Sequence, residues 1–259
     1  MAVTSVAAFV KAVEQIIDEW TPEDVEWYLQ PWFRGHGDAQ WSLEPGWYRP
    51  GMQASGLGAD YYNEGTLLEQ FKLRAPTYLE RQPASDWEWL FLMQHYGLPT
   101  RLLDWTESSL IALYFAVRDH PGNGSAAVWV MSPWWLNRET FQDYVLFPAD
   151  DARAEAHAPL RTGAALRGDL PIAITPIRAS VRIAAQRGVF TIHGTQRGAL
   201  DRLAQRRVAG SPCLRRLLIP ERNVANIRQE LAVAGISESI IFPELSGLCR
   251  ELKLGFFGI

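Results

Sequence analysis

The stretch WFRGHGDAQWSLEPGWYRP, residues 32–50, sets one arginine between a phenylalanine and a glycine and follows it with a loop rich in aromatic residues. A strand that ends at Arg34 and Gly35 can point a guanidinium into a cleft, because glycine lets the backbone turn or approach a ligand. Pro31 indicates an edge position or a bulge for this strand. The arginine predicts a bound anion, with a structural ion pair as the alternative.

Composition places the chain among globular proteins. Its 259 residues, 47% of them apolar, suffice for one domain with a packed core. A net charge of −4 argues against binding nucleic acid or an anionic membrane by bulk electrostatics. Cys213 and Cys249 fit neither a disulfide framework nor a metal site, so we expect no metal and a cytoplasmic location. The apolar pattern at 4–20 contains charged residues, which predicts an ordinary helix rather than a signal peptide or membrane span.

Hydrophobic periodicity predicts a single mixed α+β domain, with helices concentrated early and strands later. Helices are expected over 4–20, capped by Thr4, and over 64–75, 86–97, 104–117, 195–205, 221–236 and 237–253. Strands are expected over 27–35, 126–133, 171–177, 181–194 and 213–220, and a long loop over 49–63. Capping-box spacing supports two of the helix starts, Ser85 with Glu88 and Asp104 with Glu107.

Residues 161–222 hold twelve arginines against three acids, in a chain with three lysines. Solvated strand and helix faces, together with arginine-biased coding, are one explanation of this cluster. A patch that meets phosphate, including that of a nucleic acid, is the other. The sequence leaves both open.

Four successive blocks resemble the FRG domain, a family named for its Phe-Arg-Gly signature. They are the opening stretch, FLMQHYGLPTRLLDWTESSLIALYFAV (91–117), RIAAQRGVFTIHG (182–194) and IIFPELSGL (240–248). The resemblance implies an FRG domain over residues 32–248, an N-terminal helix and lead-in over 1–31, and a C-terminal tail over 249–259.

A more distant resemblance is to mono-ADP-ribosyltransferases of the arginine-serine-glutamate type. In those enzymes the arginine of an aromatic-Arg-Gly strand end holds a phosphate of NAD, and Arg34 resembles it here. Thr106 and Ser108 resemble their Ser/Thr-containing segment before a helix, and Gln186 stands nearest to their final glutamate. The resemblance implies a split β core with a helical insertion, and NAD as the substrate.

The glutamine matters chemically. Cleavage of the nicotinamide bond passes through an oxocarbenium-like ribose, which a carboxylate stabilises better than a neutral amide. Either Gln186 does a reduced job, or Asp104, Glu107 or Glu244 takes over. Each acid also has a plain structural reading, as a helix cap or an exposed side chain. If its segment is a strand, Gln186 shares one face with Arg182.

Three further residues are candidates for the same site. His95 can donate to phosphate or act as an acid, or it can interact with the carbonyl groups at its helix end. Tyr96 is grouped with it as a ligand contact. Arg101 either braces Asp104 or reaches the ligand. Sequence motifs of P-loop, dinucleotide-binding, zincin and serine-hydrolase sites are missing from the chain.

Two functions follow from these residues. In the first, a cytoplasmic effector, a toxin or antiphage component with a neutralising partner, binds NAD through Arg34 and transfers ADP-ribose to a nucleic acid or protein. In the second, a non-catalytic module grips a nucleotide or a phosphorylated partner in the same pocket. No membrane partner is expected. Both functions require Arg34, His95, Asp104 and Gln186 to converge on one cleft.

Overall fold

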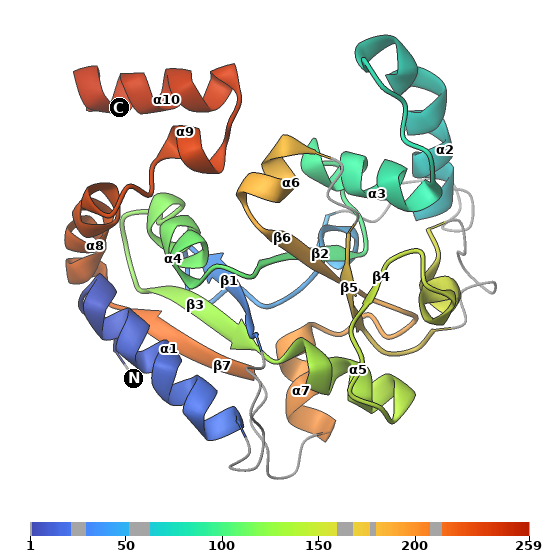
Figure 1. Cartoon of the computed structure of the whole chain (residues 1–259), viewed down its shortest axis with the longest axis horizontal. Coiled ribbons are helices and arrows are strands. Elements are labelled where there is room, and N and C mark those ends of the chain that lie inside the picture. Colours follow the sequence, from blue (N-terminus) through green and yellow to red (C-terminus); the bar gives the residue numbers. More distant parts are fainter. Residues whose placement is uncertain are drawn as a thin grey trace.

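A seven-stranded sheet lies at the centre of the computed structural model, which describes residues 2–21, 30–51, 63–159, 168–176, 180–207 and 214–258 (Figure 1). The strand order is β4-β5-β6-β2-β1-β3-β7. The strands are β1 (Trp32–His36), β2 (Leu102–Thr106), β3 (Ala126–Met131), β4 (Phe147–Pro148), β5 (Ile172–Thr175), β6 (Gly188–Ile192) and β7 (Leu214–Ile219). Neighbouring strands are antiparallel except β4 and β5.

Helices cover both faces of this sheet. They are α1 (Val6–Trp20), α2 (Glu64–Arg74), α3 (Asp86–His95), α4 (Ser109–Arg118), α5 (Pro133–Phe141), α6 (Val181–Ala185), α7 (Leu200–Arg207), α8 (Glu221–Val233), α9 (Glu238–Ile241) and α10 (Leu245–Phe257), with 3-10 turns at Gly46–Tyr48, Ala75–Tyr78 and Ala152–His157. The predicted mixture of α and β structure in one domain is confirmed. No helix in the described ranges has both the length and the apolar character needed to span a bilayer.

The sheet consists of two halves that meet at β1 and β2. Strand β1 pairs with β3 over five residues and β2 pairs with β6 over five, whereas β1 and β2 pair only at Phe33 and Thr106. Helices α1, α4 and α8 pack on the half formed by β1, β3 and β7, and α3 packs on the half formed by β2, β5 and β6 (Figure 1). The divergence of the two strands opens space between α4 and α3.

Several elements agree with the sequence prediction. Helices α2 and α3 lie where expected, and the Ser85 side chain accepts a hydrogen bond from the Glu88 backbone amide at the start of α3. Helix α8 is followed by Gly235 in the left-handed region, at φ 79°. Strands β3, β5 and β7 also lie in their predicted ranges. Local periodicity and capping signals were sufficient for these elements.

Strand β1 is not an edge strand. It lies between β2 and β3, so Arg34 is in the middle of an interior strand rather than at a strand end. Pro31 lies just before Trp32, the first paired residue of β1. Its missing N–H therefore removes no hydrogen bond from the sheet. Helix α1 also differs in detail, because its N-cap is Ser5 and not Thr4.

The region predicted as the start of a helix, from residue 104, is the strand β2. Leu102, Leu103 and Trp105 are buried on the two faces of a central strand and only Asp104 is exposed, so the strand lacks the regular alternation that would have marked it. The capping-box spacing of Asp104 and Glu107 is therefore a coincidence. Ser108 caps the following helix α4 and accepts from the Ile111 amide.

The predicted strand over 181–194 is a short helix followed by a strand. Ser180 caps α6 by accepting from the Ile183 amide, and Arg187, at φ 47°, turns the chain into β6. Gln186 is the C-cap of α6, so the predicted shared strand face of Arg182 and Gln186 is wrong. Strands also occur early in the chain, contrary to the predicted order of helices before strands. The predicted loop at 49–63 lies mostly outside the described residues.

Candidate functional site

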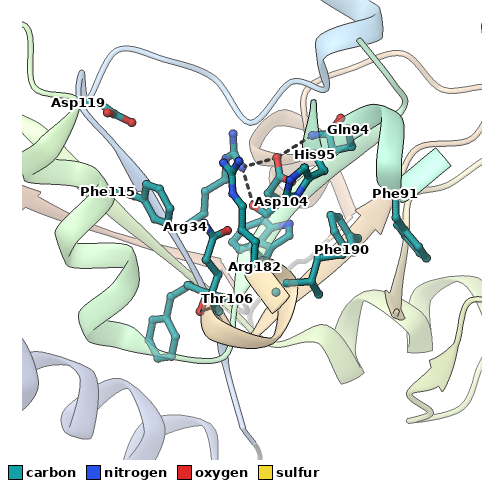
Figure 2. Close-up of a pocket in the computed structure, with 16 residues that line it drawn as sticks. Arg34, Phe91, Gln94, His95, Asp104, Thr106, Phe115, Asp119, Arg182 and Phe190 are labelled. Carbon is teal, nitrogen blue, oxygen red and sulfur yellow. Dashed lines mark hydrogen bonds and ion pairs between the residues drawn. The ribbon is translucent and has the colours of Figure 1, made fainter. Parts of the chain in front are cut away.

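An open cleft of about 250 Å³ lies at the divergence of β1 and β2 (Figure 2). It is lined by Phe33, Arg34, Gly35, Phe91, Gln94, His95, Asp104, Trp105, Thr106, Phe115, Asp119, Arg182, Ile183, Gln186, Gly188 and Phe190. These residues come from β1, α3, β2, α4, α6 and β6 or the residues that follow them. The cleft thus combines cations, carboxylates and amides with aromatic walls.

Arg34 connects the two halves of the sheet at this cleft. Alternation along β1 puts Arg34 and Gly35 on opposite faces, and the Phe33 and Thr106 pair puts Asp104 on the face of Gly35. The guanidinium therefore reaches across the gap, where its Nη1 donates to the Asp104 backbone carbonyl at 2.6 Å and lies 3.6 Å from the carboxylate. Burial lowers the pKa of Arg34, and Asp104 opposes that shift.

His36 holds the other end of the guanidinium. Arg34 Nε donates to His36 Nε2 at 3.1 Å, and His36 Nδ1 lies 3.2 Å from the Trp41 carbonyl. An accepting Nε2 requires the neutral ring with its proton on Nδ1. Burial, followed by the charge of Arg34, lowers the pKa of His36 to about 3, which agrees with that form. Arg34 is thus held in place by a neutral acceptor that cancels none of its charge.

Asp104 presents a carboxylate to the cleft from β2. Its side chain is 53% exposed, and its Oδ2 accepts from Gln94 Nε2 at 2.7 Å. The Gln94 Oε1 in turn accepts from the Thr100 hydroxyl at 2.7 Å. Figure 2 shows the bonds from Arg34 and Gln94 converging on Asp104. The carboxylate is oriented by its neighbours and still open to a ligand.

Gln186 lines the cleft at the end of α6. Its side-chain Nε2 donates to the Ile241 carbonyl at 3.3 Å, and its backbone carbonyl accepts from the Thr106 hydroxyl at 2.7 Å. The Thr106 hydroxyl also accepts from the Ser108 amide at 3.0 Å. Thr106 therefore lines the cleft and ties β2 to α6, whereas Ser108 caps α4 and is not among the lining residues.

His95 lies in the cleft and its neighbour Tyr96 does not. His95 Nε2 is 3.6 Å from Glu244 Oε1, and burial, followed by the charge of Arg182, lowers the pKa of His95. A smaller, mostly apolar hollow of about 170 Å³ shares His95, Phe91 and Ile183 with the cleft. Tyr96 is 66% exposed and is absent from the lining.

Arg101 neither braces Asp104 nor lines the cleft, so both of its predicted roles are wrong. It is buried, with its Nε 2.6 Å from Glu64 Oε2, and its other nitrogens donate to the carbonyls of His193 and His157. The Glu64 carboxylate also accepts from the Arg101 amide at 2.6 Å. This pair ties the start of α2 to β2 and is structural.

Two polar lining residues were missed by the sequence reading. Gln94 lies three residues after Phe91, which puts it on the same side of α3, next to His95. That helical spacing could have identified it. Asp119 follows the end of α4 and pairs with Arg118 at 2.6 Å. No local pattern marks Asp119 as a cleft residue.

Gly35 serves helix packing. A Cβ added there would lie 2.1 Å from the Ala112 carbonyl oxygen and 2.5 Å from the Ala116 nitrogen, both in the backbone of α4. The glycine thus lets α4 approach β1 closely, which brings Phe115 and Asp119 to the cleft. The close approach is to a helix rather than to a ligand.

Gly35→Ala is therefore expected to destabilise the protein by about 1–3 kcal/mol, because the added methyl group overpacks a rigid contact. Urea denaturation measures this change. Gly255→Ala is the control, since an added Cβ there meets nothing within 4 Å and helix α10 favours alanine. Equal stability of the Gly35→Ala variant and the wild type would contradict the close contact.

A model of the FRG domain family matches residues 30–124. Residues 30–124 are thus similar to the FRG domain. The match covers β1, α2, α3, β2 and α4, and with them Arg34, His95 and Asp104. Arg182, Gln186 and the last two resembling blocks lie beyond it, so the wider bounds of 32–248 stay a prediction. No curated protein and no solved structure matches the chain.

Proposed function

We propose that the FRG-domain chain binds NAD in the cleft between β1 and β2 and transfers ADP-ribose to a macromolecular acceptor. The observation that carries this proposal is the convergence of a held guanidinium, Arg34, and an open carboxylate, Asp104, on one cleft with aromatic walls. Consumption of NAD and modification of a macromolecule inside a cell would suit a toxin or an antiphage component.

The residues present suit the parts of NAD. Arg34 and Arg182 offer guanidinium donors to a phosphate, which guanidinium groups can bind through two parallel bonds. Phe91, Phe115 and Phe190 offer faces to a planar ring. The cleft of about 250 Å³ is smaller than typical sites for ligands of this size, so it suits one half of the dinucleotide.

The bond between the nicotinamide nitrogen and ribose C1′ breaks, and its electron pair leaves with nicotinamide. The attacking group of the acceptor forms the new bond to C1′. The carboxylate of Asp104 stabilises the positive charge that develops on the ribose. Gln186 offers only an amide, the reduced contribution expected from the sequence. His95, kept neutral by its lowered pKa, can accept the proton that the attacking group of the acceptor loses.

A specific observation also favours the second function, a non-catalytic nucleotide-binding module. The Gln186 amide group donates to the Ile241 carbonyl, so this position is built into a structural contact. A glutamine that makes this structural contact needs no catalytic role. The two functions share the anion contacts of Arg34 and differ in whether the nicotinamide bond is cleaved.

The proposal is tested by incubating the purified chain with NAD and with protein or nucleic-acid acceptors. Chromatography then measures the nicotinamide released. Asp104→Asn is expected to lower kcat about 100- to 1,000-fold, as the loss of one preorganised charge-stabilising group does. Arg34→Met is expected to raise KM at least about tenfold, the value of one charge-assisted contact. Arg153→Met is the control, because Arg153 pairs with Asp151 at the surface and does not line the cleft.

Absence of nicotinamide release with every acceptor, together with NAD binding that depends on Arg34, would reject the transferase and support the binding module. Binding that is indifferent to Arg34 would reject both functions. Thermal unfolding of each variant distinguishes loss of the site from loss of the fold.

A further inference from the structure

Three guanidinium groups surround the ring of Phe242, which lies just after α9. The guanidinium carbons of Arg118, Arg182 and Arg250 are 4.8, 4.7 and 5.0 Å from the ring centroid. The ring is buried, and it also meets Phe115 edge to face at 5.8 Å. Phe242 belongs to the block IIFPELSGL, which the proposed function leaves without a role.

Two of these three arginines are committed to one carboxylate. Glu238 accepts from Arg118 at 2.9 and 3.1 Å and from Arg250 at 2.5 Å, and the Tyr114 hydroxyl also donates to it. These bonds tie α9 to α4 on one side and α10 on the other. The position of Phe242 is therefore fixed from both sides.

Arg182 differs from the other two. It lines the cleft, and its guanidinium makes no hydrogen bond or ion pair with any residue in the described part of the chain. Burial lowers the pKa of Arg182, whereas Glu244 and Asp104 oppose that shift. A guanidinium that stacks on a ring uses its face and keeps its N–H donors, which lie at the edge, available. A carboxylate partner would occupy those donors and cancel the charge.

We propose that Phe242 is a positioning residue, whose ring holds Arg182 at the cleft with its donors free for the anionic part of the ligand. The Ile241 carbonyl, one residue earlier, holds Gln186 at the same wall. The segment 238–244 is thus part of the site although it lies outside the matched FRG range. This inference rests on the proposed binding of an anionic ligand in the cleft.

The test compares Phe242→Leu, which keeps the apolar bulk without the aromatic face, with Phe242→Tyr, which keeps both. Calorimetry with ADP-ribose and with NAD is expected to show about fivefold weaker binding for the leucine variant and wild-type binding for the tyrosine variant. In an Arg182→Met background, Phe242→Leu is expected to cause no further loss. A loss of the same size in that background would mean that Phe242 only supports the fold, and unchanged binding by Phe242→Leu would also overturn the proposal.

A second measurement needs no ligand. Modification of arginines by phenylglyoxal, followed by mass spectrometry, is expected to be at least threefold faster at Arg182 in Phe242→Leu than in the wild type. Arg138, over the Tyr144 ring, is the internal reference. An unchanged rate at Arg182 would overturn the positioning role. If the wild type binds neither ADP-ribose nor NAD, the proposed function fails, and this second measurement still decides whether Phe242 holds Arg182.

Discussion

Replacing Glu64 with glutamine is expected to destabilise the protein by about 3–5 kcal/mol, because it leaves the Arg101 charge buried without its partner. Both side chains are almost fully buried, at 2% and 3% exposure. The carboxylate accepts from the Arg101 side chain and from its backbone amide, so one substitution weakens two bonds. The start of α2 then loses its attachment to β2.

Equilibrium denaturation in urea measures this effect. Glu69→Gln is the matched control, since Glu69 lies on the exposed side of the same helix. A double-mutant cycle with Arg101→Met gives the coupling between the two side chains. If Glu64→Gln and Glu69→Gln have equal free energies of unfolding, the ion pair does not anchor α2.

Acidification is expected to destabilise the protein steeply below about pH 6.5, the usual pKa of histidine. Burial is the main cause that lowers the pKa of His36 to about 3, of His157 to about 4 and of His193 to about 3. The unfolded chain takes up these protons at a higher pH than the folded chain. The stabilisation is therefore complete above about pH 6.5 and is lost as the pH falls toward 4, by up to about 1.4 kcal/mol per pH unit for each histidine.

Urea denaturation at pH 7.5, 6.5 and 5.5 tests this expectation. The slope of unfolding free energy against pH should be shallower in His157→Asn, because one of the three contributing groups is gone. The chemical shifts of the ring protons give each pKa directly. A free energy of unfolding that stays constant from pH 7.5 to 5.5 would mean that the three histidines can be protonated in the folded state.

Local sequence signals predicted much of the fold and little of the site geometry. Ser85 and the apolar pattern of α3 are local, and that helix lies where it was predicted. In contrast, Asp104 has the spacing of a helix cap but lies in β2, because pairing with β6, more than 80 residues away, decides its conformation. The role of Arg101 is also decided by a distant residue, because its partner Glu64 lies 37 residues earlier and belongs to no sequence motif.

The resemblance of the sequence blocks to known families, rather than hydrophobic periodicity, predicted that the candidate site residues converge on one cleft. Arg34, His95, Asp104 and Gln186 all line the cleft, although three of them lie in elements whose type or position in the sheet was predicted wrongly. The contacts of the Phe242 ring with three guanidinium groups could not have been predicted, because the three arginines come from α4, α6 and α10.

The bond between the Arg34 guanidinium and the Asp104 carbonyl crosses the place where the two half-sheets pair at a single residue. An anion that draws this guanidinium toward itself competes for the cross-link that joins the halves. If the cleft binds an anion as proposed, ligand binding and the attachment of the two half-sheets depend on the same N–H groups of Arg34. A bound ligand would then weaken the attachment between β1 and β2 in proportion to the number of Arg34 donors that it takes.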